Sequence, residues 1–112
     1  MSMQLIGLLG TELSPYLEDI ARLRIQIFSE YPYLYQGSME YEMTYLKRYV
    51  DCPKFYVVLA KENNVVVGAS TCIGLEYEVE DFRLPLEQAG YESSSTVYFG
   101  ESVLLKPYRG QG

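Results

Sequence analysis

Histidine and tryptophan are absent from this 112-residue sequence, and cysteine occurs only twice. Without histidine, neither a histidine-based catalytic triad nor histidine ligation of a metal can operate. Proton transfer is then left to carboxylates, tyrosines, lysines, cysteines or water. Two cysteines are too few for a disulfide scaffold, and Cys52 precedes a proline whereas Cys72 lies in an apolar run. We therefore expect both to be reduced thiols in a cytoplasmic protein.

Basic residues are scarce, since nine lysines and arginines stand against fifteen acidic residues and the net charge is −6. This balance argues against a nucleic-acid partner, and the dispersed polar residues argue against disorder. Apolar runs are too short to span a membrane, and the first basic residue is Arg22, so we identify no targeting segment and no membrane partner. The final seven residues contain Lys106 and Arg109 and no acid, so an anionic ligand should prefer the C-terminal end.

The spacing of apolar residues predicts helices in the N-terminal half. After a strand at 3–9, a helix starts at Ser14-Pro15 and ends near Glu30, because a capping hydroxyl precedes proline at the first helical position. Ser38 caps a second helix, which Pro53 stops.

In the C-terminal half, apolar residues alternate with polar ones or form continuous runs, which is typical of strands. Phe55–Lys61 and Val65–Gly74 predict an antiparallel hairpin, and an acidic connection over 75–95 contains one short helical turn at Pro85. A last strand covers 97–105. The predicted class is α+β, with two N-terminal helices and a mostly antiparallel sheet of about four strands, in one domain over 1–112.

The chain ends in a glycine-bearing turn directly after this last strand, Arg109-Gly110-Gln111-Gly112. Such a turn lets backbone N–H groups close on a phosphate, provided that a helix follows to supply more of them. The alternative is a solvated turn or a frayed terminus.

With the apolar strand, Pro107, two N-terminal helices and a hairpin before it, this ending resembles the acyl-CoA pyrophosphate loop of the GNAT-type N-acetyltransferases. The usual loop reads Arg or Gln, two residues, Gly, one residue, then Gly or Ala. Arg109 and Gly112 match, and the sequence stops two residues before the pattern closes. The resemblance covers all 112 residues but only the N-terminal half or so of a typical family domain, so it implies an incomplete GNAT-like domain.

The resemblance also implies a co-substrate and an acceptor. The co-substrate would be acetyl-CoA or another acyl-CoA, with no metal, and the acceptor a small-molecule or peptide amine. The pantetheine would pair with backbone at Val103 and Leu105. The phosphates would contact backbone N–H groups of the terminal turn, namely Arg109, Gly110, Gln111 and Gly112.

Glu101 is the candidate general base. Strand alternation places it on one face with apolar Val97, Phe99, Val103 and Leu105, and family members often carry a glutamate on this strand as base. A buried carboxyl can accept the proton of an ammonium acceptor near neutral pH. The structural alternatives are a bulge that turns Glu101 outward, or an ion pair with Arg83 or Lys106.

Three tyrosines crowd the loop between the predicted helices, Tyr31, Tyr33 and Tyr35. In the family this segment commonly forms a wall of the acceptor pocket, so these rings are candidate substrate contacts. Core and rim packing is the simpler interpretation, and the one we favour for a protein with twelve tyrosines.

A second hypothesis is a non-catalytic, self-associating fragment. If Gly112 is the native C-terminus, its carboxylate lies where a phosphate should sit, and this polypeptide should bind acyl-CoA weakly and catalyse nothing alone. The last strand would then be an unpaired apolar edge, which predicts a homo-oligomer. A Rossmann or P-loop domain is disfavoured, because those loops need more glycines or a Gly-Lys-Ser/Thr ending.

Overall fold

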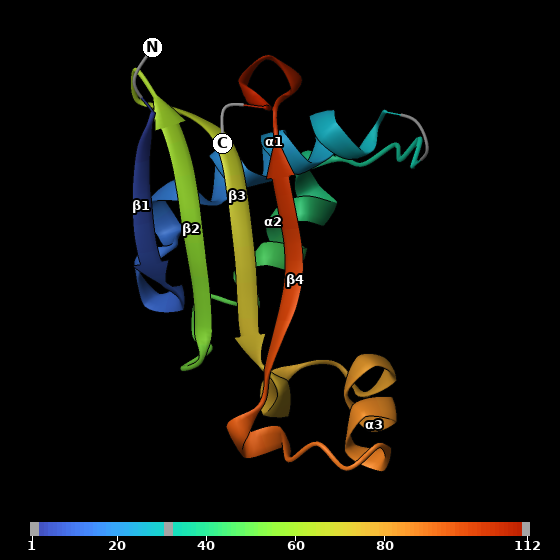
Figure 1. Ribbon diagram of the computed structural model, residues 1–112. Helices are drawn as coiled ribbons and strands as arrows, with labels where there is room; N and C mark the ends of the chain where they lie inside the picture. Colours follow the sequence, from blue (N-terminus) through green and yellow to red (C-terminus); the bar gives the residue numbers. More distant parts are fainter. Residues whose placement is uncertain (1–2, 31–32, 111–112) are drawn as a thin grey trace.

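A computed structural model describes residues 3–30 and 33–110. Four antiparallel strands form a sheet in the order β1-β2-β3-β4, with α1 and α2 packed on one face and α3 beyond one end (Figure 1). The elements are β1 (Gln4–Leu9), α1 (Leu17–Phe28), α2 (Met39–Lys47), β2 (Phe55–Glu62), β3 (Val65–Gly74), α3 (Glu80–Gln88) and β4 (Val97–Leu104). The predicted α+β class and element order are confirmed.

The second N-terminal helix begins at its predicted cap, whereas the Ser14 hydroxyl makes no capping hydrogen bond and α1 begins only at Leu17. A single 3₁₀ turn over Ser14–Tyr16, with Pro15 in it, leads into α1. The Ser38 hydroxyl accepts a hydrogen bond from the Tyr41 backbone N–H at 3.1 Å, which satisfies one of the free donors at the start of α2. Capping therefore decides where α2 starts, and burial of one face holds both helices on the sheet.

The core lies between the helices and the inner face of the sheet, which we define as the face that α1 and α2 cover (Figure 1). Full burial of each aliphatic side chain there contributes about 1.5–3 kcal/mol before the entropy of ordering is subtracted. The buried members are Leu13, Leu17, Ile20, Ala21, Leu23, Ile27, Leu46, Tyr49, Phe55, Val57, Leu59, Val66, Ala69 and Ile73.

A β-bulge interrupts β4 at Gly100 and Glu101. Ser70 of β3 pairs with Ser102, but Cys72 pairs with Phe99, so two residues of β4 face the single residue Thr71. The Glu101 N–H donates to the Thr71 hydroxyl at 3.2 Å. A Cβ added at Gly100 would lie 2.7 Å from that hydroxyl oxygen, which explains why glycine occupies the bulge.

The bulge reverses the alternation of side chains along β4. Tyr98 and Val103 both pack against the core, although they are five positions apart and regular alternation would place them on opposite faces, and Leu105 packs there as well. Phe99 is 77% exposed, and Val97 is half exposed. The prediction that Glu101 shares a face with Val97 and Phe99 is therefore wrong, because the extra residue turns those two side chains to the opposite face.

The acidic connection between β3 and β4 holds more helix than predicted. In place of one short turn, α3 has nine residues with Pro85 inside it, and it buries none of its side chains. Gly90, with φ of +101°, follows the end of this helix in a conformation that glycine adopts readily.

Candidate functional site

A partly open cavity of about 180 Å³ lies on the inner face beside the bulge, between the C-terminal part of α2 and the start of the acidic connection. It brings two carboxylates and one guanidinium together with several aromatic rings. Its lining residues are Tyr45, Arg48, Tyr49, Thr71, Glu78, Phe82, Tyr98, Gly100 and Glu101. Glu101, the predicted base, thus faces a cavity rather than open solvent.

The Glu101 carboxylate is held by an arginine from α1. Arg24 donates through Nη1 to Glu101 Oε2 and through Nε to Glu42 Oε2, the latter at 2.6 Å. Tyr35 donates its hydroxyl to the other oxygen of Glu42 at 2.8 Å. The network joins α1, α2, the aromatic loop and β4, so the partner of Glu101 is neither Arg83 nor Lys106.

The charged groups of this network are buried, so each of them needs a partner of opposite charge or a hydrogen bond. The Glu42 side chain is 0% exposed, that of Arg24 is 11% exposed and that of Glu101 is 19% exposed. Burial by itself lowers the pKa of Arg24, but the charges and hydrogen bonds of Glu101 and Glu42 outweigh it and raise that pKa above its ordinary value. Arg24 therefore keeps its positive charge, and this one cation faces the carboxyl groups of Glu42 and Glu101.

Tyr35 closes the network toward the loop. Desolvation, and then the hydrogen bond to Glu42, raise the pKa of Tyr35 to about 12. The hydroxyl consequently keeps its proton and remains a donor to Glu42 throughout the neutral range.

A second arginine lies at the cavity among tyrosines. The Arg48 guanidinium carbon is 4.3 Å from the Tyr45 ring centre and 4.5 Å from the Tyr49 ring centre, and its Nη2 donates to the Tyr49 hydroxyl at 2.5 Å. Burial raises the pKa of Tyr49, so this phenol stays neutral. The cavity wall is thereby made of rings that attract cations through their faces.

The loop tyrosines lie at a neighbouring hollow. A cavity of about 290 Å³ is lined by Arg24, Phe28, Tyr33, Tyr35 and Tyr41. The ring of Tyr33 meets Phe28 edge to face, with 5.2 Å between ring centres. Tyr31 lies outside the described residues. Because Arg24 also binds Glu101, the aromatic hollow and the bulge cavity adjoin the same ion network.

The predicted acyl-CoA contacts lie where β4 ends. Val103 pairs with Ala69 of β3. The Leu105 N–H donates to the Val67 carbonyl at 2.9 Å, and the Leu105 carbonyl accepts from the Tyr108 N–H at 3.0 Å. The Leu105 backbone is thus engaged within the fold, and the alternation of an antiparallel ladder directs the backbone groups of Ser102 and Leu104 away from β3.

The terminal turn is described as far as Gly110. Arg109 donates through Nε to the Leu104 carbonyl at 2.7 Å, and its Nη2 lies 3.8 Å from Glu30 Oε1. Gly110 has φ of +79°, in the left-handed region that glycine favours. Gln111 and Gly112 lie outside the described residues.

The sequence interpretation missed Arg24 and Glu42, although a signal for both was present. Arg24 lies in the apolar stripe of α1, four residues after Ile20 and four before Phe28. Glu42 lies in the stripe of α2, between Met39 and Leu46. A charge inside an apolar helical stripe indicates a buried ion pair, and here the two charges have opposite signs.

Residues 3–30 and 33–110 contain neither a candidate metal cluster nor a candidate membrane-spanning helix. Within these ranges, three or more cysteine or acidic side chains nowhere converge as a metal site would require. The same residues include no helix with the length and apolarity needed to cross a membrane.

No protein-family model matches the sequence, and a search of curated proteins found no significant match. Solved structures do match the fold. Aminoglycoside N-acetyltransferase AAC(6')-Iy in complex with CoA is 16% identical, with a TM-score of 0.65 over 99% of this chain and 60% of that chain. The same enzyme bound to the bisubstrate analogue CoA-S-monomethyl-acetylneamine is also 16% identical, with a TM-score of 0.64 over 100% of this chain and 63% of that chain.

A third match is an aminoglycoside acetyltransferase from an uncultured soil metagenomic sample in complex with sisomicin. It is 20% identical, with a TM-score of 0.57 over 98% of this chain and 60% of that chain. At these identities the likeness concerns the fold, and this chain spans about three fifths of the length of each structure. The chain therefore has the fold of part of a GNAT-type N-acetyltransferase domain.

Proposed function

We propose that this chain is the N-terminal part of an acyl-CoA-dependent N-acyltransferase that transfers an acetyl or acyl group to a primary amine. One observation carries the proposal: the fold matches that of a GNAT-type enzyme over 99% of this chain, and Glu101 faces a partly open cavity at the bulge of β4. We further propose that residues 1–112 form one domain unit of that enzyme. The free thiols Cys52 and Cys72 support a cytoplasmic location.

The acyl-CoA would lie along β4. Backbone groups of Ser102 and the N–H of Leu104 would pair with the pantetheine, with Val103 between them, because the Leu104 carbonyl already accepts a hydrogen bond from Arg109. Arg109 and Gly110 begin the turn that would receive the phosphates, and Gln111 and Gly112 continue it in the sequence. The positive charges of Lys106 and Arg109 favour an anionic ligand at this end.

The acceptor would be a cationic amine. The bulge cavity presents the carboxylates of Glu78 and Glu101, which would attract an ammonium group by charge, beside the ring of Tyr98. The Tyr45 ring already holds two cations, since the guanidinium carbons of Arg24 and Arg48 lie 4.6 and 4.3 Å from its centre. Tyr33 and Tyr35 would form an outer wall for the rest of the acceptor. In support, the solved structures with this fold include one bound to sisomicin and one bound to an acetylneamine bisubstrate analogue.

The chemistry needs one proton removed before attack. Glu101, directly or through water, would take a proton from the ammonium, and the neutral nitrogen would then attack the thioester carbonyl. The C–N bond forms, the C–S bond breaks, and the thiolate leaves with the second nitrogen proton. Arg24 binds Oε2 of Glu101, so the proton would go to the other carboxyl oxygen, Oε1.

The test is calorimetric titration of acetyl-CoA into the full polypeptide that contains these residues, followed by thiol-release assays with sisomicin, a peptide and lysine as acceptors. Glu101→Gln should lower kcat by about 10²–10⁴-fold and leave acetyl-CoA affinity unchanged. The matched control is Glu87→Gln, an acid of α3 that pairs with Arg83. No acetyl-CoA binding would refute the assignment.

The alternative is a non-catalytic domain that self-associates. Among the described residues β4 pairs with β3 alone, so one edge of this apolar strand presents backbone groups without a strand partner. Such edges favour pairing with another copy. A chain that oligomerises and gives no heat with acetyl-CoA would favour this alternative.

A further inference from the structure

The guanidinium of Arg24 is divided between two carboxyl groups. It donates through Nε to Oε2 of Glu42 at 2.6 Å and through Nη1 to Oε2 of Glu101. An arginine frequently binds one carboxylate with two parallel N–H groups, one to each oxygen. Here Arg24 bonds to a single oxygen of Glu101. Because the guanidinium is planar and rigid, the bond that Glu42 makes at Nε also fixes where the other two nitrogens lie.

Glu42 is placed where it can act on a reaction only through Arg24. Its side chain is 0% exposed, and it lines neither the bulge cavity nor the aromatic hollow. Both of its oxygens are occupied, one by Arg24 and the other by the Tyr35 hydroxyl at 2.8 Å. Glu42 is therefore held from two sides and cannot reach an acceptor.

The two oxygens of Glu101 have different surroundings. Oε2 is bound by Arg24, whereas Oε1 accepts no hydrogen bond from residues 3–30 and 33–110. In these same ranges, the one buried side-chain oxygen or nitrogen without a hydrogen-bond partner belongs to Glu62, so Oε1 of Glu101 is accessible. Since Glu101 lines the bulge cavity, Oε1 is the oxygen that an acceptor or a water molecule can reach.

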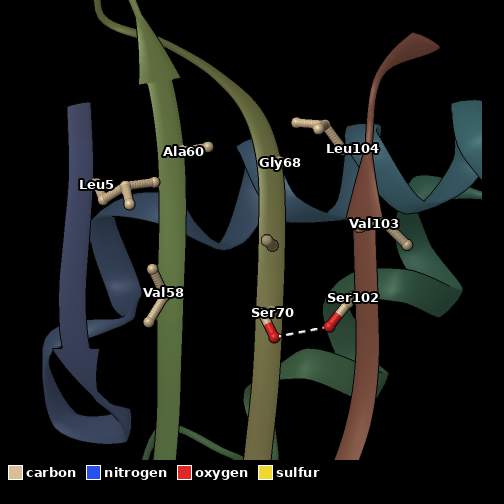
Figure 2. A pocket seen from close by; sticks show the side chains of 9 residues that line it. Leu5, Val58, Ala60, Gly68, Ser70, Ser102, Val103 and Leu104 are labelled. Atoms are coloured by element: carbon tan, nitrogen blue, oxygen red, sulfur yellow. Dashed lines mark hydrogen bonds between the residues drawn. The ribbon is translucent and has the colours of Figure 1, made fainter. Parts of the chain in front are cut away.

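The face of the sheet opposite α1 and α2, the outer face, also has a hollow, but a chemically different one. The groove there, of about 240 Å³, is lined by aliphatic side chains, glycine and two serines (Figure 2). The Ser70 and Ser102 hydroxyls bond to each other at 2.7 Å. Of these two hollows, the bulge cavity is the one that presents carboxyl groups.

We propose that Glu42 is a positioning residue for the acyl transfer: it fixes Arg24 so that the guanidinium holds one oxygen of Glu101 and leaves the other free to take the proton. This inference rests on the proposed function, in which Glu101 is the base. Without the negative charge of Glu42, the guanidinium can turn and bind both oxygens of Glu101, because a two-oxygen contact is the stronger one. Glu101 would then have no free oxygen at the cavity.

The first test measures kcat and KM separately in the full polypeptide that contains these residues. The assay uses acetyl-CoA and whichever of sisomicin, a peptide and lysine gives the highest rate. Glu42→Gln keeps the shape of the side chain and removes its charge. We expect kcat to fall about tenfold, with acceptor KM and acetyl-CoA affinity unchanged, because only the orientation of the base is disturbed.

Glu40→Gln is the matched control, since Glu40 is an exposed acid in the first turn of the same helix, and it should keep the wild-type kcat. Circular dichroism verifies folding. If Glu42→Gln does not fold, Tyr35→Phe releases the other oxygen of Glu42 and should lower kcat severalfold at unchanged KM. An unchanged kcat in the folded variant, or an equal loss in Glu40→Gln, would overturn the proposal.

The second test needs no catalysis. The carboxyl-carbon NMR resonance of Glu101, assigned by its disappearance in Glu101→Gln, should shift in Glu42→Gln and stay in place in Glu40→Gln at neutral pH. An unmoved resonance in Glu42→Gln would overturn the positioning role, whether or not the wild type transfers acetyl groups. A shifted resonance in a wild type without transfer would refute the proposed function and still support the hold of Glu42 on Glu101 through Arg24.

Discussion

The two faces of one sheet are built on opposite rules. The inner face is covered by two helices and contains a buried arginine between two glutamates. The outer face is the opposite face of the sheet, and no helix of the described residues covers it (Figure 1). The three neighbouring cross-strand rows of this face that begin at Leu5, Gly7 and Leu9 contain no charged side chain. Strands β2 and β3 contribute equally to both, since their side chains alternate between the faces.

The two faces differ in whether charged side chains are present and in what those charges do. On the inner face, helices exclude water, so a charge there must be matched atom by atom and becomes a fixed feature of the site. On the outer face, no charged side chain fixes the position of a covering surface, so shape and apolar area determine what can cover it. The candidate chemistry therefore lies on the charged, covered face.

The largest effect should come from removing the inner arginine. Arg24→Met leaves Glu42 buried without its cation, and we expect the free energy of unfolding to fall by about 3–5 kcal/mol in urea denaturation. Arg22→Met, two residues away on the exposed side of α1, should change it by less than about 0.5 kcal/mol. Equal losses in the two variants would contradict the contrast between the faces.

Leucine truncation compares the faces directly. Leu59→Ala removes a fully buried side chain of β2 and should cost about 3 kcal/mol through lost burial and a cavity. Leu5→Ala, on the outer face, should change the stability of the monomer by less than about 0.5 kcal/mol. Denaturation at low protein concentration keeps association out of the measurement. A costly Leu5→Ala would mean that the outer face is already covered.

The bulge sets which residues of β4 reach which face, and Gly100→Ala should strain it. The added Cβ would come within 2.7 Å of the Thr71 hydroxyl, at a cost of about 1–3 kcal/mol. Removing that hydroxyl with Thr71→Ala makes room, so the double variant should be less destabilised than the sum of the two single variants. Strict additivity in thermal unfolding would show that the close contact does not control the bulge.

The smallest effect concerns the hydroxyl that closes the inner network. Tyr35→Phe should lower stability by about 1 kcal/mol at neutral pH, because Glu42 loses one of its donors. The pKa of Tyr35 is raised in the folded state to about 12, from an ordinary value of about 10. Its contribution is therefore complete below pH of about 10 and is lost as pH rises toward 12.

Unfolding measured across this alkaline range should show a shallower loss of stability for Tyr35→Phe than for the wild type. Tyr33→Phe provides the control, because that side chain is 67% exposed. A Tyr33→Phe profile as shallow as that of Tyr35→Phe would contradict the role of the buried hydrogen bond.

Local patterns predicted most of the fold and only part of the site. Ser38 acts within a few residues of its own position, so the sequence is sufficient to place the start of α2, whereas α1 begins at Leu17 without the predicted Ser14 cap. The bulge depends on Thr71, nearly thirty residues away, and period-two alternation along 97–105 therefore assigned Phe99 to the wrong face. The partner of Glu101 required tertiary structure, since Arg24 is distant in sequence and Arg83 and Lys106 were nearer.

The Arg24–Glu101 link joins residues separated by 77 positions, whereas Arg24 and Glu42 are only 18 apart. During synthesis, Glu101 is added 59 residues after Glu42 (101 − 42), which at about 5–20 residues per second is a delay of several seconds. Throughout that interval Arg24 can be neutralised by Glu42 alone. Docking of β4 then completes the network, so the residue proposed to take the proton joins it after Arg24 and Glu42 are already in place.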